Sequence, residues 1–220
     1  LCQSNREIEN SAMPIVVTPQ LGDLKFVDRN GDGVIDDNDR FYLGDAFPHY
    51  TFGFTYNVDY RGFDLSMLIQ GVGSRKQSLR GDIYVPFHHG AWYPVMFQHQ
   101  LDTWTTTNTD ATYPRLSDDA SSSFSNNWGR GSDIFILDGK YIRLKNIQLG
   151  YTLPVRLVER LGLGSIRAYI TGQNLFTLSK NSFIDPESSE FDNNMGAGGA
   201  NSGRNYPTLK YYGFGINMEF

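Results

Sequence analysis

The segment DRNGDGVIDDND, from Asp28 to Asp39, places oxygen-bearing side chains at alternate positions around a central glycine. This spacing matches the calcium loop of an EF-hand, in which oxygen ligands surround the ion and a glycine makes the sharp turn. Gly33 stands at the turn position, and Val34 would supply a backbone carbonyl. The expected ligands are Asp28, Asn30, Asp32, Val34, Asp36 and Asp39. The pattern therefore predicts a calcium site in this segment.

The loop departs from the EF-hand template in two respects. Its last ligand position holds Asp39 instead of glutamate, and the shorter side chain reaches less well for bidentate contact, so weak affinity is expected. Its flanks, QLGDLKFV and RFYLGDAFPHY, do not resemble the usual pair of helices. An alternative is an acidic turn whose side chains bond to their own backbone without an ion. Calcium is favoured because carboxylates so close together repel unless a cation or solvent screens them.

The four histidines are His49, His88, His89 and His99, and two of them are adjacent in HHGAWYPVMFQH. This segment lacks the i, i+4 spacing of a helical zinc site. Its aromatic residues could stack on sugar rings or fill a protein interface. Packing of the long segment on itself is the favoured interpretation, and no substrate contact is assigned.

Catalytic motifs are incomplete throughout the chain. GVGSRK and GLGSI fall short of a nucleophile elbow, and GAGGANSG lacks the lysine of a phosphate-binding loop. No set of serine, histidine and aspartate residues stands out. The sequence therefore predicts that this chain is not an enzyme.

Composition and charge exclude further classes of protein. The chain has 220 residues, a formal net charge of -5 and a pI near 5.3, so a nucleic-acid partner is not expected. Cys2 is the only cysteine, which excludes an internal disulfide framework and a cysteine-based zinc site. No segment approaches the roughly 18 apolar residues of a membrane-spanning helix, which excludes helical spanning only. The leucine at position 1 indicates a chain cut from something longer.

Several segments have apolar residues at every second position, the spacing of a β-strand with one apolar and one polar face. In YTFGFTYNVDY, aromatic residues and a valine alternate with Thr, Gly, Asn and Asp. FDLSMLIQG repeats the pattern after a short turn at Arg61 and Gly62, which predicts a hairpin. Further strands are predicted in KYIRLKNIQLGYTLP, IRAYITGQNLFTL and LKYYGFGINMEF. The first of these three changes phase near Asn146, where a bulge or a change of environment is expected.

Short and long connections alternate between these strands. The short segment VRLVERLGLGS separates the third strand from the fourth, whereas about 60 residues separate the second from the third and about 30 the fourth from the fifth, well beyond usual loop lengths. Because antiparallel strands reverse direction, the short connections fall at one end of the sheet and the long ones at the other. One explanation is a soluble β-sandwich with the aromatic face as its core.

The other explanation is part of an outer-membrane β-barrel, apolar outside and polar inside, with long extracellular loops. The barrel is favoured because Gly, Thr, Asn, Gln and Asp suit a watery lumen, whereas a soluble surface would more often carry lysine and glutamate. Five or six strands cannot close such a barrel, so the remaining strands must lie outside this chain.

From Gly22 onward, a series of segments is similar to one known family. They are GDLKFVDRNGDGVIDDNDRFYLGDAFPHYTFGFTYNVDYRGFDLSMLIQG, DTWTTTNTDATYPRL, ILDGKYIRLKNIQLGYTLP, IRAYITGQNLFTLSKNSFIDPE and YPTLKYYGFGINMEF. Their order and spacing resemble the C-terminal part of SusC/RagA-type TonB-dependent outer-membrane transporters. The resemblance implies an all-β fold, namely the last strands of a large antiparallel transmembrane β-barrel with long extracellular loops.

The resemblance also implies a function and partners. Such transporters surround a plug with 22 strands, carry a SusD-like surface lipoprotein as a lid, and import oligosaccharides or peptides when TonB pulls on the plug. This chain would then contact the remaining barrel, the plug and the lipid of a Gram-negative outer membrane. It could not transport alone. The alternative is a secreted calcium-binding β-sandwich, an adhesion or carbohydrate-binding module; the sequence does not reveal a cargo.

The chain end carries the last predicted feature. Barrels of this family typically end in an aromatic residue preceded by alternating apolar ones, which the assembly machinery recognises. The residues that match are Tyr212, Phe214, Ile216, Met218 and Phe220. The predicted division is an extracellular loop at 1–48, a barrel hairpin at 49–72, a long extracellular loop at 73–138, a second hairpin at 139–178, an extracellular loop at 179–207 and a terminal strand at 208–220.

Overall fold

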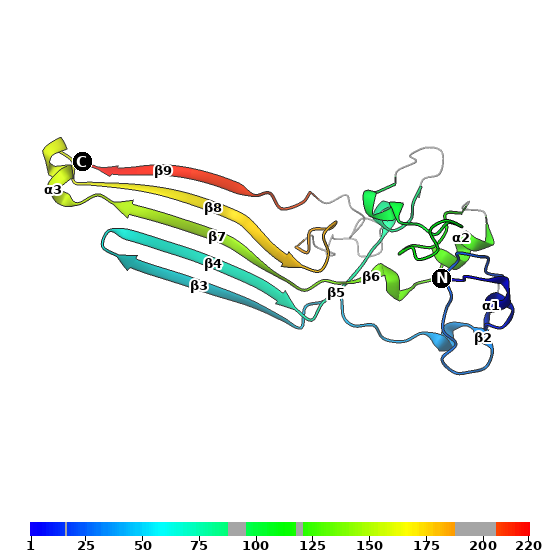
Figure 1. Cartoon of the computed structure of the whole chain (residues 1–220). Helices are drawn as coiled ribbons and strands as arrows, with labels where there is room; N and C mark the ends of the chain where they lie inside the picture. Colours follow the sequence, from blue (N-terminus) through cyan, green and yellow to red (C-terminus); the bar gives the residue numbers. More distant parts are fainter. Residues whose placement is uncertain (16, 88–95, 118–120, 188–205) are drawn as a thin grey trace. The chain divides into compact units, whose positions relative to one another are not determined.

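The computed structural model describes residues 1–15, 17–87, 96–117, 121–187 and 206–220 (Figure 1). The chain divides into two compact units, which are treated separately. We call the first the loop unit; it consists of Leu1–Gly44, Ser78–Leu137 and Glu190–Asn205. We call the second the sheet unit; it consists of Asp45–Gln77, Asp138–Ser189 and Tyr206–Phe220.

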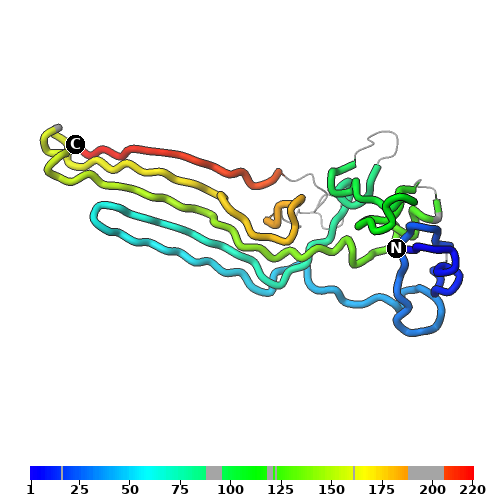
Figure 2. The backbone as a smooth tube through the Cα atoms, in the orientation of Figure 1, coloured from blue at the N-terminus to red at the C-terminus, as the bar shows by residue number. Residues whose placement is uncertain are grey.

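The sheet unit is built on one five-stranded antiparallel sheet in the order β3-β4-β7-β8-β9 (Figures 1 and 2). The strands are β3 (Tyr50–Tyr60), β4 (Phe63–Gly73), β7 (Tyr141–Thr152), β8 (Ser165–Ser179) and β9 (Tyr211–Glu219). The order of these five strands in the sheet is thus the same as their order along the chain. The strands expected from the alternating pattern are therefore present.

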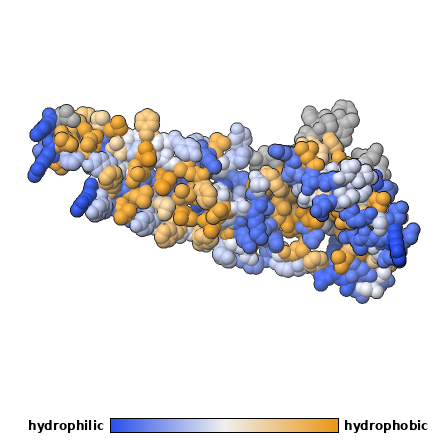
Figure 3. Space-filling view, in the orientation of Figure 1, coloured by the Kyte–Doolittle hydropathy of each residue, from blue (hydrophilic) through white to orange (hydrophobic). Residues whose placement is uncertain are grey.

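The register places most of the apolar residues of the five strands on one face, with Leu68 an exception. Phe54 lies opposite Ile69, and Leu149 lies opposite both Leu65 on β4 and Ile170 on β8. Because side chains alternate along a strand, each such pair extends one continuous apolar face. Phe54, Leu149 and Ile170 are exposed, and Leu65 and Ile69 are half-buried. Figure 3 shows apolar residues gathered along the strands. A β-sandwich would need a second layer here, and the described residues of the sheet unit supply none.

A β-bulge keeps β7 in phase with its neighbours. Asn146 pairs with Leu68 and Leu144 pairs with Ile69, so Lys145 is an extra residue between them. Before the bulge the even residues face the apolar side, and after it the odd residues do. The bulge expected near Asn146 is thus confirmed, and it returns Ile142 and Leu144 to the apolar face that Ile147 shares.

Tight connections join the strands at one end of the sheet. Arg61 and Gly62 form the β3–β4 turn with φ angles of 48° and 87°. A side chain on Gly62 would also place its Cβ 2.9 Å from the Thr152 carbonyl oxygen, so the position requires glycine. Between β7 and β8 stand helix α3 (Val155–Val158) and the 3₁₀ turn η6 (Glu159–Leu161), which ends at Gly162 in the left-handed conformation.

The loop unit is irregular but has its own core. Its helices are α1 (Asn5–Glu9) and α2 (Ser122–Asn127), and its 3₁₀ turns are η1 (Asp37–Asp39), η2 (Gly81–Ile83), η4 (Gln98–Leu101) and η5 (Asp133–Phe135). Short strands β1 (Met13–Pro14) and β2 (Val34–Ile35) pair in parallel. Two further short strands, β5 (Lys76–Ser78) and β6 (Ile136–Asp138), lie where the chain passes from one unit to the other and belong to neither unit alone. The core consists of Leu24, Val85, Tyr113, Trp128 and Phe135.

The core of the loop unit was not anticipated. The sequence pattern predicts two separate loops at 1–48 and 73–138, whereas the structure joins much of both in one packed unit. Tyr84 stacks edge-on against Trp128 and Phe135, with ring centroids 5.7 and 4.5 Å apart.

The helices of the described residues are all too short or too polar to span a membrane.

Candidate functional site

The acidic loop between Asp28 and Asp39 is held by its own backbone. Both Asp28 carboxylate oxygens accept backbone N–H groups, from Gly31 at 2.6 Å and Gly33 at 2.8 Å. The Asp32 carboxylate accepts the N–H of Val34 at 2.9 Å. These short-range bonds are the turn geometry that aspartate favours. The alternative interpretation, a turn stabilised without an ion, therefore describes the hydrogen bonds of this loop.

Asp39 joins the two halves of the loop. Its carboxylate accepts the N–H of Arg29 at 2.7 Å and the N–H of Asp36 at 2.9 Å. These two backbone hydrogen bonds lower the pKa of the Asp39 carboxyl below its ordinary value. Asp39 thus closes the loop through the backbone.

The calcium prediction is not tested by this arrangement. No group of three or more His, Cys, Asp or Glu side chains is placed to hold a metal ion in the part of the chain that the structure describes. The loop carboxylates are directed at backbone donors, and the donor set as arranged does not form a cation cage. Each carboxylate oxygen can accept more than one interaction, however, so backbone bonding and ion binding are compatible.

The histidines do not converge on one site. His99 is half-buried, and its Nε2 lies 3.1 Å from the carbonyl oxygen of Ile83. Burial lowers the pKa of His99, and its ring packs edge-on against Tyr113 at 5.8 Å. His49 pairs with Asp45 at 2.6 Å. His88 and His89 lie outside the described residues; among the described residues of this segment, the Phe97 and His99 rings pack with centroids 6.0 Å apart.

The polar face of the sheet carries an ion pair that spans three strands. Arg167 on β8 binds Asp64 on β4 through its Nε, at 2.8 Å, and its Nη2. The intervening strand presents Gly150, where a Cβ would lie 2.4 Å from an Asp64 oxygen and 2.5 Å from Arg167 Nη2. Glycine is therefore needed for the two side chains to meet. The Arg167 guanidinium also lies over the Tyr169 ring at 5.0 Å.

A second ionic cluster lies at the opposite end of the polar face. Arg143 is 4% exposed and binds Asp185 at 2.5 Å, Glu187, and the Thr177 hydroxyl at 2.8 Å. Lys145 at the bulge also binds Glu187, at 2.8 Å. The cluster fastens residues beyond β8 to β7, which explains why the extra residue of the bulge is a lysine.

Hydrogen bonds fix the charge state of Asp185 in this cluster. Although burial raises its pKa, donors from the Glu187 backbone, Thr208 and Arg143 outweigh that effect and lower the pKa to about 2. Asp185 is therefore ionised at neutral pH. Nearby, buried Arg75 donates through Nη1 to the Pro186 carbonyl at 3.2 Å, while its Nε and Nη2 have no hydrogen-bond partner within the described residues.

The terminal strand exposes the five residues of the predicted assembly signal. Tyr212, Phe214, Ile216 and Met218 lie on the apolar face of β9, opposite Gly172, Ile170, Ala168 and Ile166 of β8. Phe214 is 87% exposed and Phe220, which follows β9, is 97% exposed. The alternation is as expected, and the role in assembly stays a prediction.

The buried polar residues of the loop unit form a network that sequence analysis missed. Asp23 is fully buried and accepts hydrogen bonds from Ser123 at 2.7 Å and Asn127 at 3.0 Å. Asn127 in turn accepts the backbone N–H of Leu24 at 2.8 Å, and Asn126 donates to the Leu24 carbonyl at 2.9 Å. The partners are about 100 residues apart in sequence, so no local pattern reveals them. The network is structural, because each side chain in it bonds another member or the backbone of Leu24.

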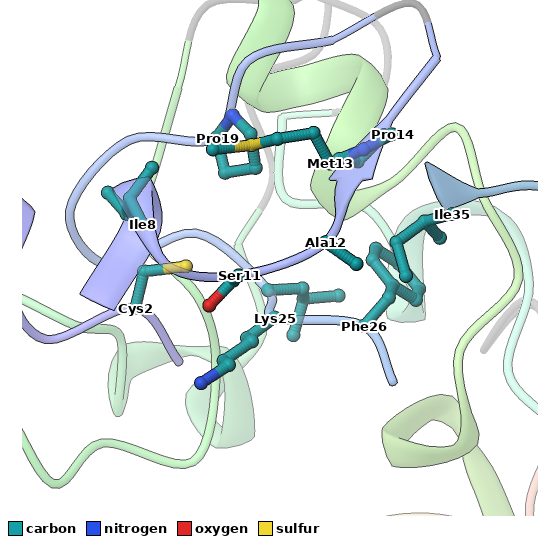
Figure 4. Close-up of a pocket in the computed structure, with 11 residues that line it drawn as sticks. Cys2, Ile8, Ser11, Ala12, Met13, Pro14, Pro19, Lys25, Phe26 and Ile35 are labelled. Atoms are coloured by element: carbon teal, nitrogen blue, oxygen red, sulfur yellow. The ribbon is translucent and has the colours of Figure 1, made fainter. Parts of the chain in front are cut away.

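The hollow beside Cys2 is too small for a ligand. Figure 4 shows Cys2, Ile8, Met13 and Phe26 among the side chains that line it. Its volume is about 10 Å³, no more than the space that a single water molecule needs. Burial raises the pKa of the Cys2 thiol, which keeps it protonated and unreactive. The residues that line this hollow therefore pack the loop unit and do not form a binding site.

Comparison with known proteins places the chain among receptors. TonB-dependent receptor P26 from Formosa agariphila is 33% identical over 223 residues, which cover 99% of this chain and 21% of that receptor. TonB-dependent receptor P3 from the same organism is 30% identical over 89% of this chain and 19% of its own length. TonB-dependent receptor SusC from Bacteroides thetaiotaomicron is 29% identical over a segment that covers 89% of this chain and 17% of that receptor. No protein-family model matches.

The solved structures agree in fold. The RagAB peptide importer in its open-open state matches with a TM-score of 0.60 and 23% identity, covering 89% of this chain and 20% of that chain. A second RagAB peptide transporter structure matches with a TM-score of 0.59. The chain spans about a fifth of the length of the receptors it matches.

An antiparallel sheet with one exposed apolar face, one polar face and strands of about ten residues is the wall of a transmembrane β-barrel. The sheet unit is such a wall segment, and the fold class expected from the sequence is confirmed. The chain belongs to the TonB-dependent receptors of the SusC/RagA type and corresponds to their C-terminal part. Its relatives are receptors by name, which is consistent with the prediction that it is not an enzyme.

Proposed function

We propose that this chain forms part of the barrel wall of an outer-membrane importer in a Gram-negative bacterium. The sheet unit supplies lumen wall on its polar face and lipid contact on its apolar face. The loop unit lies outside the cell, as do the residues that connect β4 to β7 and β8 to β9. Import is a binding and gating process, and it needs the plug and the rest of the barrel.

The exposed apolar face is the observation that supports this proposal most directly. The 11 residues of β3 extend about 36 Å, and a tilt of about 45° reduces this to about 25 Å, the height of the apolar band of an outer-membrane barrel. Tyr50 and Tyr60 end the strand with aromatic rings, as the aromatic girdles at both membrane surfaces do. A lipid environment accounts for both the exposure and the length.

The free edges of the sheet support pairing with the rest of the barrel. In the described sheet β3 pairs only with β4, and β9 pairs only with β8. An unpaired strand edge presents backbone donors and acceptors that cannot be satisfied in lipid. We infer that the strand before β3 and the first strand of the receptor cover these edges.

The proposed partners follow the relatives. SusC-type and RagAB-type receptors support a SusD-like surface lipoprotein as the lid over the loop unit, with TonB acting through the plug. The cargo proposed is an oligosaccharide or a peptide. The RagAB structures are described as peptide importers, which favours neither cargo here, because likeness at 23% identity concerns the fold alone.

Purification of the full-length receptor from its native outer membrane tests this function. We expect the receptor in the outer-membrane fraction, together with a SusD-like lipoprotein in about equal amount, and uptake of labelled cargo that stops when TonB is removed. Recovery of the receptor in the soluble fraction, without lipoprotein, would contradict the proposal.

For the Asp28–Asp39 loop we propose weak calcium binding that adds to its backbone hydrogen bonds. The support is the spacing of the oxygen ligands, with Asp39 at the last position. Calcium titration of the full-length receptor by calorimetry tests it, with Asp28→Asn as the comparison. Equal heats for the two proteins, at the level of buffer dilution, would leave the ion-free turn as the explanation.

A further inference from the structure

The apolar face of the sheet is hollowed near the ends of the strands that lead into the long connections. The hollow has a volume of about 370 Å³, within the range of small-molecule pockets. Its apolar walls include Tyr50 and Phe52 from β3, Ile142 from β7 and Leu178 from β8. Lys140 and Lys180 line it as well. Every one of these residues belongs to the sheet unit.

Two glycines on β4 give the hollow its depth. The ring of Phe52 occupies the space that a side chain on Gly71 would need, since a Cβ there would lie 2.2 Å from the ring. The ring of Tyr50 lies over Gly73 in the same way, again at 2.2 Å. The two rings therefore lie flat on β4 instead of projecting outward. The space between them and the aliphatic side chains of β7 and β8 is left open.

Two lysines, Lys140 and Lys180, line one end of this hollow. Tyr141 pairs with Ser179 in the register of β7 and β8, so Lys140 and Lys180 follow at the next position, on the same face as Ile142 and Leu178. Both ammonium groups approach one carboxylate, that of Asp138, at 3.1 and 3.5 Å. The cluster of Lys140, Lys180 and Asp138 thus has two positive charges and one negative charge.

These lysines remain open to a second anion. Their side chains are 53% and 72% exposed, whereas the side chain of Asp138 is 22% exposed. An exposed pair of this kind contributes little energy by itself, so it does not hold the ammonium groups in place. Long lysine stems that cross apolar surface with the charge at the polar boundary are typical of residues at a membrane interface.

We propose that this hollow binds an acyl chain of an anionic lipid, whose phosphate is held by Lys140 and Lys180. The inference rests on the proposed function, which places the apolar face in the outer membrane and the long connections outside. An acyl chain supplies the apolar surface that the two rings and the two aliphatic side chains match. A phosphate supplies the negative charge that one carboxylate shared by two lysines leaves uncompensated.

Native mass spectrometry of the full-length receptor, purified from its outer membrane in mild detergent, tests the lipid site. We expect retained phosphate-bearing lipid on the unaltered receptor and at least about a tenfold loss in the double variant Lys140→Gln, Lys180→Gln. The control is Lys25→Gln, Arg40→Gln, which removes the same charge from the loop unit. Equal lipid retention in the three proteins overturns the inference.

A second variant keeps the test valid when the lysine variant does not assemble. Ile142→Trp fills the hollow and leaves both lysines in place, and we expect it to lose the bound lipid as well.

In a titration of delipidated receptor, phosphatidylglycerol should bind more tightly than phosphatidylcholine with the same acyl chains. Equal binding of the two lipids would contradict the role of the lysines.

The outcomes separate this inference from the proposed function. A receptor that spans the outer membrane but retains no lipid at the lysines contradicts the lipid site alone. A receptor dimer that Lys140→Gln, Lys180→Gln dissociates would assign the hollow to a second copy and overturn the lipid site. A receptor found outside the membrane contradicts the proposed function itself.

Discussion

At the scale of single residues, the polar groups of this chain are held by matched partners. Asp39 binds two backbone N–H groups across its loop, and Asp64 binds Arg167 across the strand that separates them. Each arrangement depends on one residue whose replacement has a defined geometric effect. These contacts predict the effect of pH on the loop and the effects of two substitutions, Asp39→Ala and Gly150→Val, each of which has a control substitution.

Asp39→Ala should loosen the acidic loop. The substitution leaves the N–H groups of Arg29 and Asp36 without their carboxylate acceptor, which destabilises the closed loop. Hydrogen exchange at these two amides should become faster. Asp37→Ala is the control, because Asp37 pairs only with exposed Arg40 in the described structure. Unchanged exchange in the Asp39 variant would show that the loop is held by other contacts.

The same contact predicts how the loop responds to pH. The pKa of Asp39 is lower in the folded loop than in the unfolded chain, so its stabilising effect is complete above the unfolded value of about 3.9. It is lost as the pH falls through the lower folded value. Exchange at the Arg29 amide, corrected for its intrinsic pH dependence, should lose protection only in acid. Loss of protection between pH 6 and 8 would point to a different group, since the pH window follows from the pKa of the group that titrates.

Gly150→Val should destabilise the barrel wall, because a side chain at this position separates the Asp64 carboxylate from the Arg167 guanidinium. The measurement is the urea midpoint for unfolding of the full-length receptor in detergent. Gly53→Val is the matched control, since a Cβ on Gly53 meets no atom within 4 Å. Equal midpoints for the two variants would contradict the role given to Gly150.

At the scale of elements, strand register decides which side chains meet lipid. The alternating pattern was enough to predict all five strands and the phase change near Asn146. It was less clear in β8, and the structure shows why: Asn174 has a φ of 53°, and the pairing steps from Leu144–Phe176 to Asn146–Gln173. Two β8 residues there oppose a single β7 residue, so a strict period of two fails locally.

Deletion of Lys145 should reverse the facing of the first part of β7. Without the extra residue, Ile142 and Leu144 would turn to the polar face, and Arg143 would turn to the lipid and lose Asp185 and Glu187 as partners. The amount of heat-modifiable, folded receptor in the outer membrane should fall severalfold. Lys145→Ala, which keeps the bulge, should lower it much less. Normal assembly of the deletion variant would contradict the register argument.

The terminal strand gives a second prediction at this scale. Phe220→Ser should reduce the amount of assembled receptor, because the last aromatic residue of the exposed apolar row is lost. Glu219→Gln is the control, since Glu219 is in β9 but outside that row. Pulse-chase measurement of receptor in the outer membrane distinguishes the two. Equal assembly rates would leave β9 as an ordinary strand without a signal.

At the scale of the whole molecule, sequence and structure differ most in the loop unit. Its core joins residues that are far apart, such as Leu24 and Trp128, and its buried polar network joins Asp23 to Asn127. Such contacts have no local period, and the segments that make them resemble loops in composition. The sheet unit could be predicted because lipid imposes the same alternation on every strand, whereas the loop unit has no repeated constraint of that kind.

Lipid is expected to cover the apolar face of the sheet. The access of oxygen and of a water-soluble reagent to spin labels along β3 tests this expectation most directly. Spin labels at Phe52, Phe54 and Tyr56 of the full-length receptor in its outer membrane should be reached by oxygen and protected from a water-soluble nickel reagent. Labels at Thr51, Gly53 and Thr55 should show the reverse, because they face the lumen. Protection of the aromatic positions from both reagents would mean that protein covers this face, and would contradict the account.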